Sequence, residues 1–237
     1  MEECALQFND VSFAYPGGAE VLRHISFAVR RGEKVALVGL NGSGKSTLLL
    51  HCNGLLLPDR GTVAVNGTPI TARTAVACRR AVGMVFQNAD DQLFMPTVEA
   101  DVAFGPHTMG LDNDAIAARV DSALKMTGCE HLRDLPPFRL SGGQKKMVSI
   151  ATVLSMEPEI LVFDEPTSGL DFAARAQFIS IVDRLPHTSV MSTHDMELVS
   201  RLCTRAIVMT KGSISYDGPV DTLPYPNLND MPYENDR

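Results

Sequence analysis

The chain has 237 residues, of which 45% are hydrophobic, and its formal net charge is −7. This length allows one large α/β domain with a substantial core, and the acidic balance argues against a protein that binds nucleic acid by neutralising its phosphates. No apolar run approaches the ~18 residues needed to span a bilayer, and the acidic start lacks the apolar region of a signal peptide. We therefore expect a soluble, cytoplasmic protein, which does not exclude a membrane-bound partner.

Cysteine and histidine spacing gives no sign of a metal site. The five cysteines form no C-x-x-C pair, and the six histidines show no H-x-x-x-H spacing. Neither a disulfide framework nor a zinc site is expected, and the thiols are expected to be buried or inert.

The first part of the chain alternates apolar and polar residues. Two or three antiparallel strands are expected between residues 5 and 30, with a turn at Pro16-Gly17-Gly18 between them. The run 34–38 is apolar after its first residue, Lys34, which is typical of a buried parallel strand. Antiparallel strands followed by a parallel one predict a mixed sheet.

A glycine-rich loop follows that strand and leads into a helix at 48–51. It has the pattern G-x-x-x-x-G-K-S-T, and its strand–loop–helix context indicates a phosphate-binding loop. Curled backbone N–H groups and a helix N-terminus attract anions there. Lys45 is expected to reach the β- and γ-phosphates and Ser46 to bind Mg²⁺. The alternative is an ordinary turn with a surface lysine. The residues expected to hold the nucleotide are Gly39, Asn41, Gly42, Ser43, Gly44, Lys45, Ser46 and Thr47.

Strands and helices continue beyond this loop. We expect a strand at 62–67 ending in an Asn-Gly turn, a short basic helix at 72–80 and a strand at 83–87. The polar segment 88–96 interrupts this alternation, and the pattern from 97 to 144 is helical. This insertion, about residues 90–156, predicts a helical subdomain inside the α/β core. Thr97 suggests the start of one of its helices, and Asp112 or Asn113 is expected to cap another.

Ser141-Gly142-Gly143-Gln144 opens the next helix. Ser141 and Gln144 have the spacing of a capping box, which alone would explain them as a helix start. However, each glycine costs ~1 kcal/mol relative to alanine in a helix. Bare backbone at a helix N-terminus therefore favours a closely bound anion.

A second buried strand, 160–163, ends in Asp164-Glu165. In open α/β sheets, ligands bind at the carboxyl ends of strands. Given the phosphate loop upstream, Asp164 is expected to hold Mg²⁺ through water and Glu165 to take a proton from an attacking water. The alternative is a solvated acidic turn.

The last third of the chain contributes one more candidate. After a helix at 172–185, the strand 189–193 ends at His194, which is expected at the same sheet edge as Asp164. It is either a site residue or a satisfied structural histidine. Strands at 206–210 and 213–217 form a closing hairpin, and a polar tail, 223–237, is expected to be poorly ordered.

These motifs, in this order, resemble those of the nucleotide-binding subunits of ABC transporters over residues ~5–220. The resemblance implies an α/β fold with a P-loop NTPase core, a mixed sheet, an N-terminal antiparallel β subdomain and an inserted helical subdomain. It implies a single domain, 1–222, with ATP and Mg²⁺ as cofactors. Such subunits hydrolyse ATP as head-to-tail dimers, in which the LSGGQ motif of one subunit caps the ATP held by the other.

The same resemblance assigns roles to individual residues. It places Tyr15 against the adenine, although the residue pattern alone equally allows a half-buried strand aromatic. Gln87 takes the position that contacts Mg²⁺ and the attacking water, Glu165 resembles the catalytic base, and His194 resembles the residue that contacts the γ-phosphate. Asp171 lies in the loop that crosses the dimer. One departure is Lys145-Lys146-Met147, where many relatives carry a basic residue or Gln followed by Arg; this leaves open what supports that helix.

The segment 85–106 resembles the ATPases of energy-coupling-factor importers, which take up vitamins or cobalt and nickel ions. There it forms a groove, near Gln87–Asp101, for a transmembrane scaffold subunit that works with a substrate-binding membrane subunit. The short ending is similar to the cobalt and nickel subgroup. This implies a peripheral protein at the cytoplasmic face of the membrane, with a homodimer expected. The alternatives are a vitamin-type importer, a soluble ATPase acting on DNA or ribosomes, and a regulatory protein that binds ATP without hydrolysing it.

Overall fold

The computed structural model describes residues 4–224. These form two compact units: residues 80–186 make one, and the segments before and after them make the other. The expectation of a poorly ordered tail falls almost entirely outside the described residues. Between 4 and 224, none of the helices has the length and apolar character required to span a membrane.

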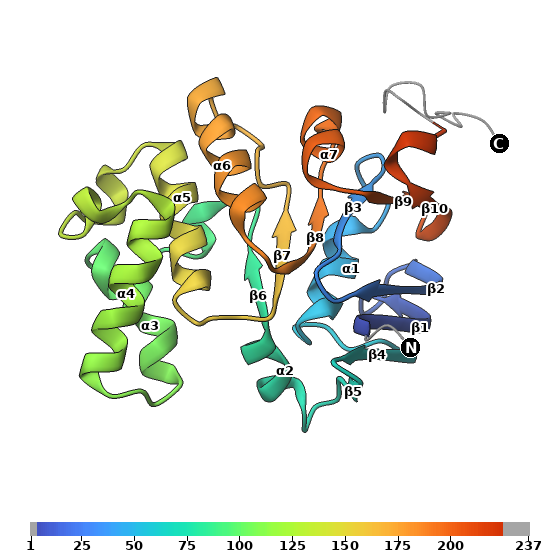
Figure 1. Cartoon of the computed structure of the whole chain (residues 1–237). Helices are drawn as coiled ribbons and strands as arrows, with labels where there is room; N and C mark the ends of the chain where they lie inside the picture. The colour runs from blue at the N-terminus through green and yellow to red at the C-terminus, as the bar shows by residue number, and fades with distance from the viewer. Residues whose placement is uncertain (1–3, 225–237) are drawn as a thin grey trace. The chain divides into compact units, whose positions relative to one another are not determined.

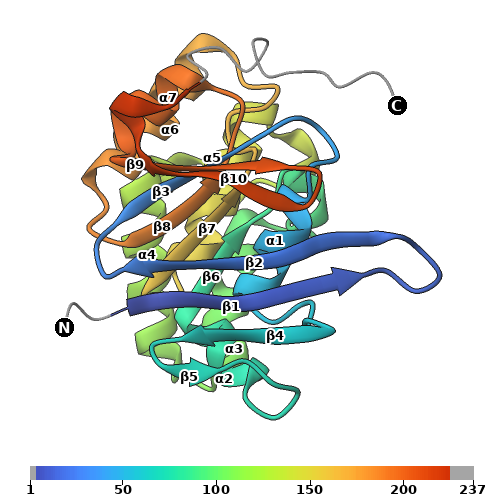
Figure 2. The same ribbon diagram turned by 90° about the vertical axis from the view of Figure 1, so that its right-hand side faces the viewer.

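An antiparallel sheet occupies the N-terminal part of the first unit, in the strand order β2-β1-β4-β5 (Figure 2). Its members are β1 (Cys4–Ala14), β2 (Glu20–Arg30), β4 (Arg60–Val65) and β5 (Thr68–Pro69). Because side chains alternate along a strand, one face gathers the apolar residues, and Phe8 stacks on Phe27 with ring centroids 4.7 Å apart. Asn66 and Gly67, both at positive φ, form the tight turn expected between β4 and β5.

A mixed set of strands completes the first unit. β3 (Lys34–Val38) runs parallel to both β8 (Thr188–Ser192) and β9 (Arg205–Thr210), while β10 (Ser213–Pro219) is antiparallel to β9. The mixed character is therefore confirmed, but it comes from β10. The N-terminal strands pair with β4 in a sheet of their own.

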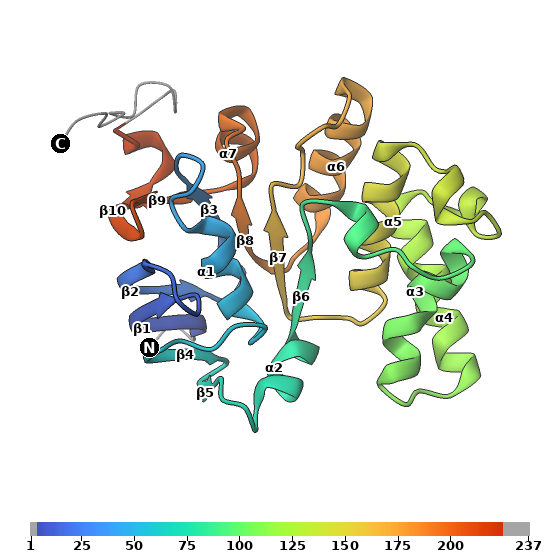
Figure 3. The ribbon, with the colours of Figure 1, turned by 180° about the vertical axis from the view of Figure 1, so that it is seen from behind.

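Helices α1 and α7 and a 3₁₀ turn lie wholly within the first unit. Helix α1 (Lys45–Cys52) contacts β2 and β4 on one side and β8 on the other, so it lies between the two sheets (Figure 3). Helix α7 (Met196–Leu202) was not expected from the sequence pattern. The 3₁₀ turn η4 (Val220–Thr222) follows β10. Helix α2 (Ala75–Ala81) lies where the chain passes into the second unit.

The second unit contains a parallel strand pair and a cluster of helices. Every residue of β6 (Val82–Val85) and β7 (Ile160–Asp164) is buried. Helices α3 (Val98–Thr108), α4 (Asn113–Thr127) and α5 (Gly142–Leu154) contact one another, so the expected helical insertion is present (Figure 1). Helix α6 (Phe172–Arg184) follows β7. Short 3₁₀ turns connect these elements: η1 (Ala89–Asp91), η2 (Glu130–Leu132) and η3 (Pro137–Arg139).

Polar side chains fix the starts of helices α3 to α7. Each accepts a hydrogen bond from the backbone N–H three residues on, which satisfies one of the donors that a helix leaves unpaired. The capping residues are Thr97, Asp112, Ser141, Asp171 and Asp195. Of the alternatives Asp112 and Asn113, Asp112 is therefore the cap.

Four of the cysteines are buried and Cys4 is exposed. Burial raises the pKa of Cys203 to about 12. Such thiols stay protonated and inert at neutral pH.

Candidate functional site

The glycine-rich loop between β3 and α1 is strongly curled. Gly39, Gly42 and Gly44 have φ values of 155°, 79° and 102°. A Cβ added at Gly39 would stand 2.4 Å from the carbonyl oxygen of Met209, so only glycine fits there. Around Gly42, by contrast, a Cβ would meet no described atom within 4 Å. The loop thus packs closely at its start and is open at its middle.

The polar groups of this loop suit phosphate oxygens. The Lys45 ammonium donates to the carbonyl oxygens of Gly39, at 2.7 Å, and Leu40, at 3.1 Å, so it is held over the loop. The Ser43 hydroxyl is buried and has no hydrogen-bond partner among the described residues. A buried polar atom of this kind is costly unless a ligand or water satisfies it. These residues therefore fit the phosphates of a nucleotide, and an ordinary turn with a surface lysine is excluded because Lys45 is buried.

Tyr15 lies beside the helix that the loop opens. Its hydroxyl is 3.3 Å from Oγ1 of Thr47, and its ring meets Phe13 edge-on. The side chain is 42% exposed. A partly exposed aromatic face next to a phosphate loop is available for stacking on a base.

In the first unit, strand register brings His194 to the phosphate loop. Leu37 of β3 is paired with Ser192 of β8, and the Thr193 N–H donates to the Leu37 carbonyl at 3.2 Å. Gly39 and His194 each follow that register pair by two residues. Both therefore lie at the carboxyl edge of these parallel strands, where α/β proteins bind ligands.

In the second unit, strand register brings Gln87 to Glu165 in the same way. Val85 of β6 is paired with Phe163 of β7, and the two candidate residues each follow that pair by two positions. Asp164 is 7% exposed and Glu165 9% exposed. The alternative of a solvated acidic turn is therefore wrong.

Glu165 also has an unusual backbone conformation, with φ at +41°. Side chains other than glycine, asparagine and aspartate rarely adopt this left-handed region, because Cβ crowds the backbone. Strained residues of this kind cluster at functional sites. The strain fixes the direction in which the carboxylate leaves the end of β7.

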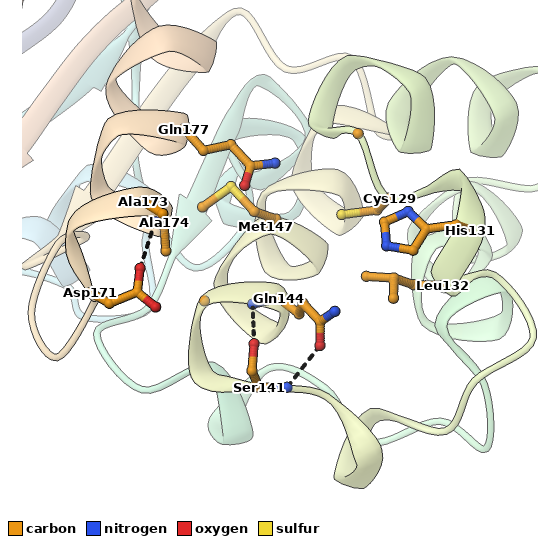
Figure 4. A pocket seen from close by; sticks show the side chains of 12 residues that line it. Cys129, His131, Leu132, Ser141, Gln144, Met147, Asp171, Ala173, Ala174 and Gln177 are labelled. Carbon is orange, nitrogen blue, oxygen red and sulfur yellow. Dashed lines mark hydrogen bonds between the residues drawn. The ribbon is translucent and has the colours of Figure 1, made fainter.

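The capping box is confirmed at the start of α5. Gln144 N–H donates to Ser141 Oγ at 3.3 Å, and Ser141 N–H donates to Gln144 Oε1 at 2.9 Å. Figure 4 shows both side chains at the edge of a pocket of about 240 Å³, with Asp171 at the start of α6 on its other side. Asp171 caps α6 by accepting from the Ala174 N–H at 2.8 Å.

The two glycines of this motif differ in their surroundings. A Cβ added at Gly142 would meet no described atom within 4 Å, whereas one at Gly143 would stand 2.7 Å from Cβ of Ala174. Close packing against α6 therefore accounts for Gly143. The open backbone at Gly142 is what a closely bound anion would need.

The sequence patterns missed one residue, Lys146, although they marked its neighbourhood as unusual. This lysine is buried in α5, and its ammonium donates to the backbone carbonyls of Phe86 and Gln87. Two consecutive lysines after a helix start suggest a solvated surface. The partners of Lys146 lie some sixty residues earlier in the chain, so local patterns carry no signal for them.

Comparisons with known proteins agree with this geometry. The family model described as ABC transporter matches residues 22–168. A Geobacter sulfurreducens protein named as an ABC transporter ATP-binding protein is 51% identical over 92% of this chain and 88% of its own length. The energy-coupling factor transporter ATP-binding protein EcfA of Methanoculleus marisnigri is 46% identical, over 92% and 80%. The structure of cbiO1 from Clostridium perfringens, described as part of the ABC transporter complex cbiONQ, has a TM-score of 0.84 and 39% identity, covering 93% and 90%.

Proposed function

Because the chain belongs to the ABC transporter family of ATP-binding proteins, we propose that it hydrolyses ATP to drive an energy-coupling-factor importer of cobalt or nickel ions. The observation that carries the ATPase part is the register of the two parallel strand pairs, which sets Gly39 beside His194 and Gln87 beside Glu165 at strand ends. The similarity to EcfA and to cbiO1 supports the importer class.

The phosphate loop would bind the nucleotide, and the acidic end of β7 would act on the attacking water. Bound MgATP supplies the transferable γ-phosphoryl group. Backbone N–H groups of the loop and the Lys45 ammonium would bind the phosphates, and His194 would contact the γ-phosphate. Ser46, Gln87 and Asp164 would hold Mg²⁺. Glu165 would accept a proton from the attacking water.

A second copy of the chain would complete each site. The open backbone at Gly142 and the Ser141 hydroxyl would face the nucleotide held by the partner's loop, so a two-fold homodimer would contain two such sites. Asp171 borders the same pocket as Ser141, Gly143 and Gln144, which supports placing it at that interface.

An exposed aromatic pair supports the docking of a transmembrane scaffold subunit near Gln87–Asp101. Phe94 is 63% exposed and Phe104 43% exposed, with ring centroids 4.9 Å apart. The buried Asp101 carboxylate accepts from the N–H groups of Phe94 and Met95, at 3.0 Å each, and so fixes the turn that presents the pair. Rigid exposed aromatics are typical anchors of protein interfaces. The chain would then lie at the cytoplasmic face of the membrane, together with a substrate-binding membrane subunit.

Glu165→Gln tests the ATPase, and a transport assay tests the importer. The variant should bind ATP as the parent does and release no phosphate above background, because the amide cannot accept the proton. Normal turnover would remove Glu165 from the base role. The complex co-purified from membranes should take up Co²⁺ or Ni²⁺ in vesicles. Vitamin uptake would point to the vitamin-type importer instead, and ATPase activity stimulated by DNA or ribosomes would point to a soluble ABC ATPase.

A further inference from the structure

Lys146 is a buried cation without a carboxylate in hydrogen-bond contact in the described part of the chain. The residue is 2% exposed, and its ammonium donates to the carbonyl oxygens of Phe86, at 2.9 Å, and Gln87, at 2.7 Å. Burial lowers the pKa of Lys146 to about 8, partly opposed by the negative charge of Asp164. Burying a charge is unfavourable unless hydrogen bonds compensate, so these two bonds are what keep the ammonium in place.

The carbonyls that Lys146 binds belong to a stretch that has left its strand. The ladder between β6 and β7 ends at the pair Val85–Phe163, so the backbone at residues 86 and 87 is no longer held by it. Hydrogen bonds from outside the sheet must then fix the backbone there. Two of these come from the one ammonium of Lys146.

Gln92 fastens the same segment to α5 from its other end. Its side-chain oxygen accepts from the Phe86 N–H at 3.3 Å. Its side-chain nitrogen donates to the Ser149 carbonyl at 2.8 Å and to Thr152 Oγ1 at 2.7 Å. Segment 86–92 is thereby tied to α5 at both ends. At its start the bonding side chain is Lys146 of α5, and at its end it is Gln92 of the segment itself.

We infer that Lys146 is a positioning residue for ATP hydrolysis, which holds residues 86 and 87 against α5 and so sets the direction of the Gln87 side chain beyond the end of β6. The inference rests on the role proposed above for Gln87. Helix α5 also begins with the residues of the capping box, so the proposed nucleotide-capping motif and the Gln87 backbone are linked to one helix. Lys146 also supplies the polar support of α5 that the unusual Lys-Lys-Met sequence left open.

Replacing the ammonium without changing the volume much tests this role. In Lys146→Met, kcat should fall at least ~10-fold while KM for ATP stays within about twofold, because the phosphate loop is untouched. Lys146→Gln keeps an N–H donor on a side chain one bond shorter, and should recover part of kcat. Lys125→Met removes an exposed lysine of the same unit and should behave as the parent. Steady-state phosphate release by the full chain measures all three, and thermal unfolding confirms that each is folded.

Two results would overturn the inference. One is a Lys146→Met chain with the parental kcat; the other is a rise in KM that accounts for the whole loss. If Lys146→Met does not fold, Lys146→Gln takes its place: a parental kcat in that variant, or a loss explained wholly by a higher KM, would overturn the inference.

A double-mutant cycle shows whether Lys146 acts through the Gln87 side chain. Gln87→Ala removes that side chain and leaves its carbonyl in place, so adding Lys146→Met should lower kcat by less than about twofold more. Fully additive losses would contradict the inference. Failure of the proposed function looks different: Glu165→Gln or Gln87→Ala would then hydrolyse ATP normally, whatever Lys146→Met does.

Discussion

Gly143 lies so close to Ala174 that a Cβ at residue 143 would stand 2.7 Å from the Cβ of Ala174. The first turns of α5 and α6 meet at this point. Gly142, one residue earlier, has open space around it instead. Packing against α6 therefore requires glycine at residue 143 but not at residue 142.

Gly143→Ala should lower the free energy of unfolding by about 1–3 kcal/mol, because the added methyl group overpacks the contact with α6. Ala174→Gly in the same chain should recover part of the loss. Gly142→Ala, the matched control, should not destabilise the chain and should gain up to ~1 kcal/mol from helix propensity. Denaturant unfolding without nucleotide gives all four values. Equal stability of the two single alanine variants would contradict this account of Gly143.

Tyr15 can be tested with two substitutions that separate its ring from its hydroxyl. If the ring stacks on the adenine, Tyr15→Ala should weaken ATP binding by roughly 1–3 kcal/mol, the typical contribution of base stacking. Tyr15→Phe keeps the ring and loses only the contact with Thr47, so its affinity should stay near that of the parent. Equilibrium titration with a fluorescent ATP analogue measures both. Unchanged affinity in Tyr15→Ala would favour the alternative of a strand aromatic without a ligand role.

His51 should make stability depend on pH. Its ring is fully buried, and Nδ1 is 2.7 Å from the Thr47 carbonyl. Burial lowers its pKa from 6.5, so below pH 6.5 the unfolded chain binds a proton that the folded chain does not. The free energy of unfolding should therefore fall as the pH drops below 6.5, by up to about 1.4 kcal/mol per pH unit from this group.

The measurement for His51 is urea unfolding at a series of pH values. His51→Gln, which cannot titrate, should have a flatter profile below pH 6.5 than the parent. Parallel profiles would show that the imidazole titrates alike in the folded and unfolded chains.

Phe94→Ala should weaken the attachment of the chain to its membrane partner and leave its own ATPase activity unchanged. The ring is exposed and touches Phe104, so its removal takes apolar area from the surface without opening the core. An anchor of this kind typically contributes about 2 kcal/mol or more to an interface. Co-purification from detergent-solubilised membranes measures the attachment. Phe138→Ala, at a ring that is 80% exposed elsewhere on the same unit, is the control.

Much of the fold could be predicted because its signals are local. Alternating apolar residues predicted β1 and β2, and Asp112 predicted the start of α4 correctly. Helix α7 was missed although Asp195 caps it, since its apolar residues follow a strand end too closely to show a clear helical period.

What the sequence could not supply was contact between distant residues. The strand predicted to reach residue 87 ends at Val85, because the next backbone groups bond to Lys146 and Gln92 and not to a strand. The sequence also could not show why residue 143 must be glycine, since Ala174, against which it packs, lies thirty-one positions further along the chain. The positive φ of Glu165 leaves no mark on the sequence at all.

The carbonyl of Met209 beside Gly39 has a consequence for how this loop is expected to diverge among descendants of the same ancestor. A lineage that abandoned nucleotide binding would still be obliged to keep the first glycine, since the neighbouring strand excludes any larger residue. Gly42 has open space around it, so only its φ of 79° would still favour glycine there, and asparagine or aspartate could replace it at modest cost. A relative that keeps Gly39 but has lost Gly42 would therefore be expected to retain the fold without binding a nucleotide.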